Sequence, residues 1–213
     1  MATIADNLQA IRSRAPGVTL LAVSKGHGAE RIREAAAAGQ KAFGENYVQE
    51  ALEKMKVLPA LEWHLIGALQ SNKTRLAAEH FDWVQTIATE KIARRLSDQR
   101  PVARAPLNVL IQVNVSGEAT KSGVELDEVE ALGKAIAAMP RLRLRGLMAI
   151  PEPGAERSRY SSVKDLFDRL KGEFALDTLS MGMSDDLELA LSEGATMVRI
   201  GTAIFGKRER VSA

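Results

Sequence analysis

Val18-Thr19-Leu20-Leu21-Ala22-Val23-Ser24-Lys25 predicts a buried strand, because a short and nearly continuous apolar run is typical of a strand covered on both faces. Gly26-His27-Gly28 follows and leads into a helix expected from about Ala29 to Ala38, which Gly39 closes. This loop holds only two of the glycines of Gly-x-Gly-x-x-Gly, the pattern with which open doubly wound sheets bind dinucleotides. The first strand and helix therefore favour another kind of parallel α/β fold.

The same order of strand, loop and helix recurs along the chain. We expect further strands at residues 41–46, 61–67, 83–87, 108–115, 142–150, 178–182 and 197–201. Apolar residues at helical spacing predict intervening helices at about 48–55, 72–79, 92–96, 126–139, 160–174 and 185–192. Ile4, Leu8 and Ile11 predict an additional N-terminal helix, which stops before Pro16-Gly17. Eight strands alternating with helices predict an α/β fold, a closed (β/α)8 TIM-type barrel, with an open doubly wound sheet as the alternative.

Composition narrows the class of protein. The chain has 213 residues, 46% hydrophobic and 26% charged, and no linker or low-complexity tract interrupts it, so we expect one domain over residues 1–213. A net charge of +2 from 29 basic and 27 acidic residues predicts no strong attraction to nucleic acid or membranes. We see no signal peptide and no apolar segment near the roughly 20 residues that span a bilayer, and therefore expect a cytoplasmic protein.

Metal chemistry is not expected either. The chain has no cysteine, which excludes disulfides and thiolate metal sites. The three histidines, His27, His64 and His80, show no paired ligand spacing. For His64 we expect a hydrogen-bonded side chain facing the barrel interior rather than a ligand or base.

Lys25 is a charged residue at the carboxyl end of the first predicted strand, which is where barrel enzymes collect functional groups. A buried ammonium is costly unless it is paired, ligated or chemically used. One such use is a Schiff base, since desolvation lowers the pKa of a lysine and frees its amine. On strand position alone, a lysine that reaches out to solvent is the alternative.

The loops after the last two strands carry small residues and hydroxyls. Gly182 and Ser184 follow strand seven, and Gly201 and Thr202 follow strand eight. These are the loops in which barrels commonly hold a phosphate, and glycine lets backbone amides approach an anion closely. The local alternative is that Ser184 only caps a helix beginning at Asp185.

Arg199 interrupts the apolar run Met197-Val198-Arg199-Ile200-Gly201. Alternation along a strand places it opposite Val198 and Ile200, so it points into the barrel if those two face the helices. A buried guanidinium needs a partner. One interpretation is an internal salt bridge to Glu45 or Glu62. The other is a hydrogen bond to the ring nitrogen of a pyridine, which arginine would leave unprotonated.

Seven segments, in order along nearly the whole chain, resemble motifs of the pyridoxal phosphate homeostasis protein family. They are Leu21-Ala22-Val23-Ser24-Lys25, Phe43-Gly44-Glu45-Asn46-Tyr47, Trp63-His64-Leu65-Ile66-Gly67, Leu69-Gln70-Ser71-Asn72-Lys73, Arg145-Gly146-Leu147-Met148, Leu179-Ser180-Met181-Gly182-Met183-Ser184-Asp185-Asp186 and Arg199-Ile200-Gly201-Thr202-Ala203-Ile204-Phe205-Gly206. The resemblance implies a barrel like the N-terminal domain of alanine racemase. It also implies a carrier or regulator of the vitamin B6 pool rather than a catalyst.

The resemblance also implies site residues and partners. Lys25 would hold pyridoxal 5'-phosphate as a Schiff base, Asn46 would contact it near the ring hydroxyl, and Arg199 would face the ring nitrogen. The phosphate would lie against Ser184, Gly201 and Thr202. Enzymes that use pyridoxal phosphate would receive the cofactor. We also expect a monomer, because we see no second domain like the one that supplies a dimer partner in alanine racemases. Gly26-His27-Gly28 departs from the threonine and proline common in this loop, and predicts a more mobile loop.

Two other functions stay open at this point. An amino-acid racemase of the pyridoxal phosphate type would need an acid–base group on each face of its substrate. The two tyrosines, Tyr47 and Tyr160, show no setting of that kind in the sequence, and we expect no β-rich second domain like that of alanine racemases. An aldolase that forms a Schiff base between Lys25 and a sugar is the other alternative.

Overall fold

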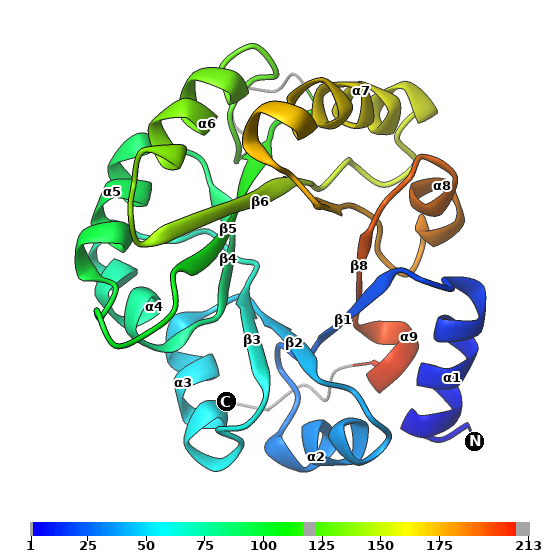
Figure 1. Cartoon of the computed structure of the whole chain (residues 1–213). Coiled ribbons are helices and arrows are strands. Elements are labelled where there is room, and N and C mark those ends of the chain that lie inside the picture. The colour runs from blue at the N-terminus through cyan, green and yellow to red at the C-terminus, as the bar shows by residue number, and fades with distance from the viewer. Residues whose placement is uncertain (1, 117–121, 208–213) are drawn as a thin grey trace.

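The computed structural model describes residues 2–116 and 122–207 and shows a closed barrel of parallel strands in the order β1 to β8. The strands surround the centre and the helices form an outer ring (Figure 1). The strands are β1 (Thr19–Val23), β2 (Ala42–Glu45), β3 (Glu62–Leu65), β4 (Trp83–Ile87), β5 (Leu107–Val113), β6 (Leu142–Ala149), β7 (Thr178–Ser180) and β8 (Met197–Ile200). Pairing of β1 with β8, from Thr19↔Met197 to Ala22↔Ile200, closes the barrel. The predicted TIM-type barrel is confirmed, and the open sheet is wrong.

The helices lie outside the strands. They are α1 (Ile4–Arg14), α2 (Ala29–Ala37), α3 (Val48–Val57), α4 (Thr74–His80) after the short 3-10 helix η1 (Ser71–Lys73), α5 (Glu90–Gln99), α6 (Val129–Ala137), α7 (Arg157–Phe174), α8 (Leu187–Ser192) and α9 (Thr202–Phe205). The predicted N-terminal helix is α1, which begins with a capping box between Thr3 and Asp6. Asn7 donates a hydrogen bond of 3.0 Å to the carbonyl of Ile204, which joins α1 to α9.

Several predicted elements are shorter in the structure than in the sequence analysis. β1 ends at Val23 and β7 at Ser180, although backbone hydrogen bonds to the neighbouring strands continue at Ser24 and at Met181 and Gly182. α8 begins at Leu187 rather than at Asp185. α9 was not predicted, since four residues are too few to show a helical period.

Two kinds of core follow from strand alternation. Val198 and Ile200 belong to the large apolar cluster between the strands and the helices. The barrel interior holds two smaller apolar clusters, Leu21, Val23, Ala42, Ile66 and Met197 in one, and Trp83, Leu110 and Met148 in the other. Polar side chains are buried in the interior as well, among them His64, Gln85, Ser180 and Arg199, which is unusual because barrel interiors are dominated by branched apolar residues.

Two features are absent from the part of the chain that the structure describes. None of its helices has both the length and the apolar character needed to cross a membrane. It also contains no group of three or more histidine, aspartate or glutamate side chains placed to hold a metal ion. His64 is instead fully buried and hydrogen-bonded to Glu62 and Gln85, as expected for a histidine inside the barrel.

Candidate functional site

A cavity of about 590 Å³ opens at the carboxyl ends of the strands. Twelve residues line it: Val23, Lys25, Asn46, Ile66, Ile150, Met183, Ser184, Asp185, Arg199, Gly201, Thr202 and Ala203. All six site residues predicted from the sequence are among them. They come from segments far apart in the chain, and the barrel topology brings them together because parallel strands all end at one face.

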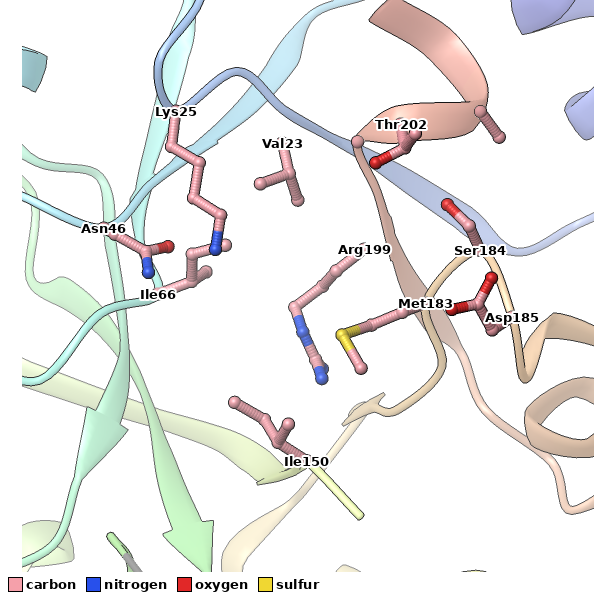
Figure 2. Close-up of a pocket in the computed structure, with 12 residues that line it drawn as sticks. Val23, Lys25, Asn46, Ile66, Ile150, Met183, Ser184, Asp185, Arg199 and Thr202 are labelled. Atoms are coloured by element: carbon pink, nitrogen blue, oxygen red, sulfur yellow. The ribbon is translucent and has the colours of Figure 1, made fainter. Parts of the chain in front are cut away.

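The polar groups of this pocket lie on opposite sides of it. Lys25 and Asn46 extend from one side, while Ser184 and Thr202 present their hydroxyls on the other (Figure 2). The guanidinium of Arg199 lies between them, deeper toward the barrel. This arrangement suits a ligand with an electrophilic carbon at one end, an anionic group at the other and a ring between the two.

Ser24, the residue that directly precedes Lys25, belongs to an ionic cluster that was not predicted from the sequence. The Lys54 ammonium donates hydrogen bonds to Glu45 Oε1 (2.6 Å), Glu50 Oε1 (2.8 Å) and the Ser24 carbonyl (2.8 Å). The Ser24 hydroxyl donates to the same oxygen of Glu45 at 2.6 Å. We call Ser24, Glu45, Glu50 and Lys54 the Lys54 cluster. It holds the peptide unit that directly precedes Lys25.

The pKa values of the two carboxyl groups in the Lys54 cluster are shifted in opposite directions. Burial raises the pKa of Glu45, although Lys54 and Ser24 counteract this effect. Burial also acts to raise the pKa of Glu50, but hydrogen bonds from Lys54 and from the Gly26 backbone outweigh it and lower the pKa. The cluster therefore depends on the ammonium of Lys54, which both carboxyl groups share.

The loop after Lys25 is tethered at three points. The Gly26 N–H donates to Glu50 Oε1 at 2.6 Å, and the His27 N–H donates to the Ser24 carbonyl at 3.0 Å. The His27 ring packs against Phe205 of α9, with ring centroids 5.0 Å apart. The loop that we expected to be more mobile is thus connected both to the Lys54 cluster and to the helix that carries Thr202.

The opposite side of the pocket is built from the β7–α8 loop and the start of α9. Ser184 does not cap a helix at Asp185, so that alternative is wrong: Asp186 precedes the first residue of α8. One carboxylate oxygen of Asp186 accepts the Met183 N–H at 2.6 Å, and the other accepts the Tyr160 hydroxyl at 2.6 Å. These bonds hold Asp186 in the loop and leave the Ser184 hydroxyl to the pocket (Figure 2).

Asn46 depends on a close backbone contact. A Cβ on Gly67 would lie 2.1 Å from the Asn46 carbonyl oxygen, so only glycine fits between these two loops. We expect Gly67→Ala to displace Asn46, to lower the free energy of unfolding by about 1–3 kcal/mol and to weaken ligand binding. Denaturant unfolding and a binding titration measure both effects. Gly172→Ala, on α7 with open space at the Cβ position, is the matched control and should leave binding unchanged. Unchanged binding in Gly67→Ala would contradict this role.

Arg199 points into the barrel as predicted. It is 4% exposed, and it donates hydrogen bonds to the Ser180 hydroxyl (2.8 Å) and the Ala149 carbonyl (2.9 Å). Burial lowers the pKa of Arg199 to about 10, which leaves it protonated at neutral pH. The predicted salt bridge to Glu45 or Glu62 is wrong, because Glu45 pairs with Lys54 and Glu62 with His64.

The residues around the site that sequence reasoning missed share one property: each looks ordinary in its own element. Lys54 follows Glu50 at helical spacing, a pattern typical of exposed surface pairs. The spacing carries no signal of burial, and the pairing of Lys54 with Glu45 at the end of β2 is seen only in the structure. Ile150 and Met183 also line the pocket. Residue type alone does not predict that these two apolar side chains are partly exposed.

Comparison with known proteins agrees with this architecture. Residues 1–209 match the family model for the alanine racemase N-terminal domain. A Pseudomonas aeruginosa protein called pyridoxal phosphate homeostasis protein is 54% identical over 226 residues, which cover 98% of this chain and 97% of the relative. An Escherichia coli protein of the same name is 52% identical over 223 residues, covering 98% and 95%.

A solved structure extends the comparison to three dimensions. PipY of Synechococcus elongatus with PLP (pyridoxal phosphate) bound matches with a TM-score of 0.86 at 38% identity, covering 96% of this chain and 100% of that one. The sequence identities and the shared barrel agree with the seven motifs described above. The chain therefore belongs to the alanine racemase N-terminal domain family and, within it, to the pyridoxal phosphate homeostasis proteins.

Proposed function

We propose that this protein binds pyridoxal 5'-phosphate and carries or regulates the intracellular supply of vitamin B6. The observation that carries the proposal is the pocket in which an amine, a buried guanidinium and two hydroxyls lie at separate positions. The names of the relatives and the PLP bound to PipY support it. We also propose that residues 1–213 form a single domain, the barrel that binds the cofactor.

The donor set fits the two ends and the ring of this cofactor. Lys25 would hold the cofactor as a Schiff base through the aldehyde carbon of the cofactor, which is the chemistry that a lysine amine offers a carbonyl group. Asn46 would contact the ring hydroxyl from the same side of the pocket. Arg199 can only donate hydrogen bonds. The ring nitrogen that faces it would therefore be the unprotonated acceptor. When bound, the cofactor supplies an electron sink, and an unprotonated ring nitrogen weakens that sink.

The phosphate would lie against Ser184, Gly201 and Thr202. A Cβ on Gly201 would come within 3.2 Å of the Val23 carbonyl, so glycine keeps the backbone close to β1 and open toward the pocket. The Asp186 carboxylate would repel an anion, but its two oxygens accept hydrogen bonds from the Met183 N–H and the Tyr160 hydroxyl. The hydroxyls of Ser184 and Thr202, together with the backbone at Gly201, offer the uncharged hydrogen-bond donors that a phosphate needs.

Loss of these hydroxyls gives a direct prediction for the phosphate. A hydrogen bond to a charged group contributes about 1.5–3 kcal/mol, so Ser184→Ala and Thr202→Val should each weaken cofactor binding at least about tenfold. Equilibrium titration with pyridoxal 5'-phosphate measures this effect. Titration with pyridoxal, which lacks the phosphate, should show no difference between wild type and variants. Ser192→Ala, on the exposed side of α8, is the control. Equal losses for both ligands would place the phosphate elsewhere.

A role without fast turnover is part of the proposal. Tyr47 is 68% exposed and does not line the pocket, and Tyr160 is buried with its hydroxyl on Asp186. Burial and this carboxylate raise the pKa of Tyr160, which makes it a poor base at neutral pH. We expect no substantial racemisation of amino acids by the purified protein. Turnover that is lost in Lys25→Ala would support the racemase instead.

The experiment that tests the function is spectroscopic. Added pyridoxal 5'-phosphate should give a visible absorbance band that borohydride bleaches, with one ligand bound per chain. A sugar aldolase would show no such band and would instead be trapped by borohydride with its sugar substrate. We propose further that the protein acts in the cytoplasm as a monomer and that apo-enzymes using this cofactor receive it. Transfer to such an apo-enzyme, followed by the gain of its activity, checks the last point.

A further inference from the structure

The barrel interior contains a continuous chain of hydrogen bonds that ends at the cofactor pocket. Arg199 donates to the Ser180 hydroxyl (2.8 Å), and Ser180 donates to Gln85 Oε1 (2.7 Å). Gln85 Nε2 contacts His64 Nδ1 at 2.9 Å, and His64 Nε2 contacts Glu62 Oε1 at 2.8 Å. We call these five residues the interior chain. It links strands on opposite sides of the barrel, because β4 pairs with β3 and β5 and not with β7.

The direction of every bond in the interior chain follows from Arg199. A guanidinium has donors only, so the Ser180 oxygen must accept from it and turn its own proton toward Gln85. The amide oxygen of Gln85 is then used, and its nitrogen donates to His64 Nδ1. His64 is left with its proton on Nε2, which it donates to the carboxylate of Glu62. The bonds therefore all point the same way, from the cation to the anion.

Glu62 anchors the far end of the interior chain. It is the first residue of β3, at the barrel face opposite the pocket, and its side chain is 46% exposed. The hydrogen bond from His64 lowers the pKa of Glu62, and burial only partly opposes that effect. A carboxylate that is ionised at neutral pH thus ends a chain that begins on a buried guanidinium.

The His64 ring is fixed by its neighbours as well as by hydrogen bonds. It stacks on Trp83 with ring centroids 5.0 Å apart and planes 8° from parallel. The Arg145 guanidinium also lies over the Trp83 ring, 4.7 Å from the ring centroid, and Arg145 forms a salt bridge with Asp177. This packing leaves His64 little freedom to turn and break the chain.

Polar residues in a barrel interior need an explanation in function. Burying a hydroxyl, an amide and an imidazole costs free energy unless each is hydrogen-bonded, and branched apolar residues would fill the same space without that requirement. The hydrogen bonds of Arg199 go to Ser180 and Ala149, and the charge of Asp186 acts to raise the pKa of the guanidinium. The interior chain adds a hydrogen-bonded connection from this guanidinium to a second carboxylate, Glu62.

We propose that Ser180, Gln85 and His64 are positioning residues, which hold the Arg199 guanidinium in place for the ring of the bound cofactor. Glu62 accepts the last hydrogen bond of the chain at the opposite barrel face. This inference rests on the proposed function, because it assigns Arg199 to the ring nitrogen. The consequence is that a substitution deep in the barrel changes the cofactor's properties without touching the cofactor.

The test uses substitutions that remove hydrogen bonds and keep volume. Gln85→Met interrupts the middle of the interior chain, and Ser180→Ala interrupts it next to Arg199 with a smaller change in packing. Each should weaken binding of pyridoxal 5'-phosphate about tenfold and shift the pH midpoint of the visible band. The double variant should be no weaker than the weaker single variant, because both break one chain. Gln40→Met is the matched control: Gln40 is 4% exposed and bonds to the Leu20 and Ala42 carbonyls, away from Arg199.

The outcomes separate this inference from the proposed function. If wild-type protein fails to bind pyridoxal 5'-phosphate, the proposed function is wrong. If wild type binds and both single variants keep its affinity and pH midpoint, the positioning role is wrong and the function stands. A crystal structure of ligand-free Gln85→Met gives a readout without the cofactor. The Arg199 side chain should be displaced there, and an unmoved guanidinium would also overturn the inference.

Discussion

Replacement of Lys54 by methionine is expected to lower the free energy of unfolding by about 3–5 kcal/mol, because it leaves two carboxyl groups without their shared ammonium. Lys54 is 7% exposed, Glu45 is fully buried, and Glu45 Oε2 has no hydrogen-bond partner even with the lysine present. Methionine fills similar space, so the loss reports the charge rather than a cavity. Denaturant unfolding followed by circular dichroism measures the change.

The same helix provides the control for Lys54. Lys56 pairs with Glu53 at 2.6 Å, but both side chains are largely exposed, so Lys56→Met should leave the unfolding midpoint almost unchanged. Adding Glu45→Gln to Lys54→Met should recover part of the lost stability, since it removes the unpaired buried charge. Equal, small effects of Lys54→Met and Lys56→Met would show that the buried cluster contributes no more than a surface pair.

Replacement of Lys25 by methionine is expected to abolish the visible band that borohydride bleaches. The substitution keeps the length of the side chain and removes the only nitrogen that can attack the aldehyde carbon at this position. The fold should persist, because Lys25 lies in a turn after β1 and is partly exposed. Absorbance after addition of pyridoxal 5'-phosphate, with unfolding curves measured in parallel, checks both statements.

Lys73 provides the control for Lys25. It lies in η1 after the third strand and does not line the pocket, so Lys73→Met should keep the full band. Weak binding without the band should remain in Lys25→Met, through the phosphate contacts of Ser184 and Thr202. A band that survives in Lys25→Met and disappears in Lys73→Met would reverse the assignment.

The architecture could be predicted from the sequence because its pattern is local and repeated. The strand at 83–87 has the bounds that its apolar run predicts, and the N-terminal helix follows from three apolar residues at helical spacing. The start of α8 could not be predicted. Ser184-Asp185-Asp186 has the composition of a helix N-terminus, but the Asp186 carboxylate binds the Met183 N–H and holds the segment in a turn.

The candidate site likewise contains residues that could be predicted from the sequence and residues that could not. Lys25 and Arg199 could be identified because each is a charge in an apolar run, and barrel topology brings strand ends together. Gln85 is also polar in an apolar run, yet its partners His64 and Ser180 lie on other strands, and register decides which side chains meet across the interior. Lys54 lies on an amphipathic helix where a lysine is ordinary. Its burial arises only once β2 and α3 pack together.

Mass spectrometry of the protein reduced with borohydride in the presence of pyridoxal 5'-phosphate tests the central claim most directly. We predict one adduct with the mass of the reduced cofactor, on the peptide that contains Lys25. An adduct on Lys73, or a protein that takes up no cofactor, would contradict the account.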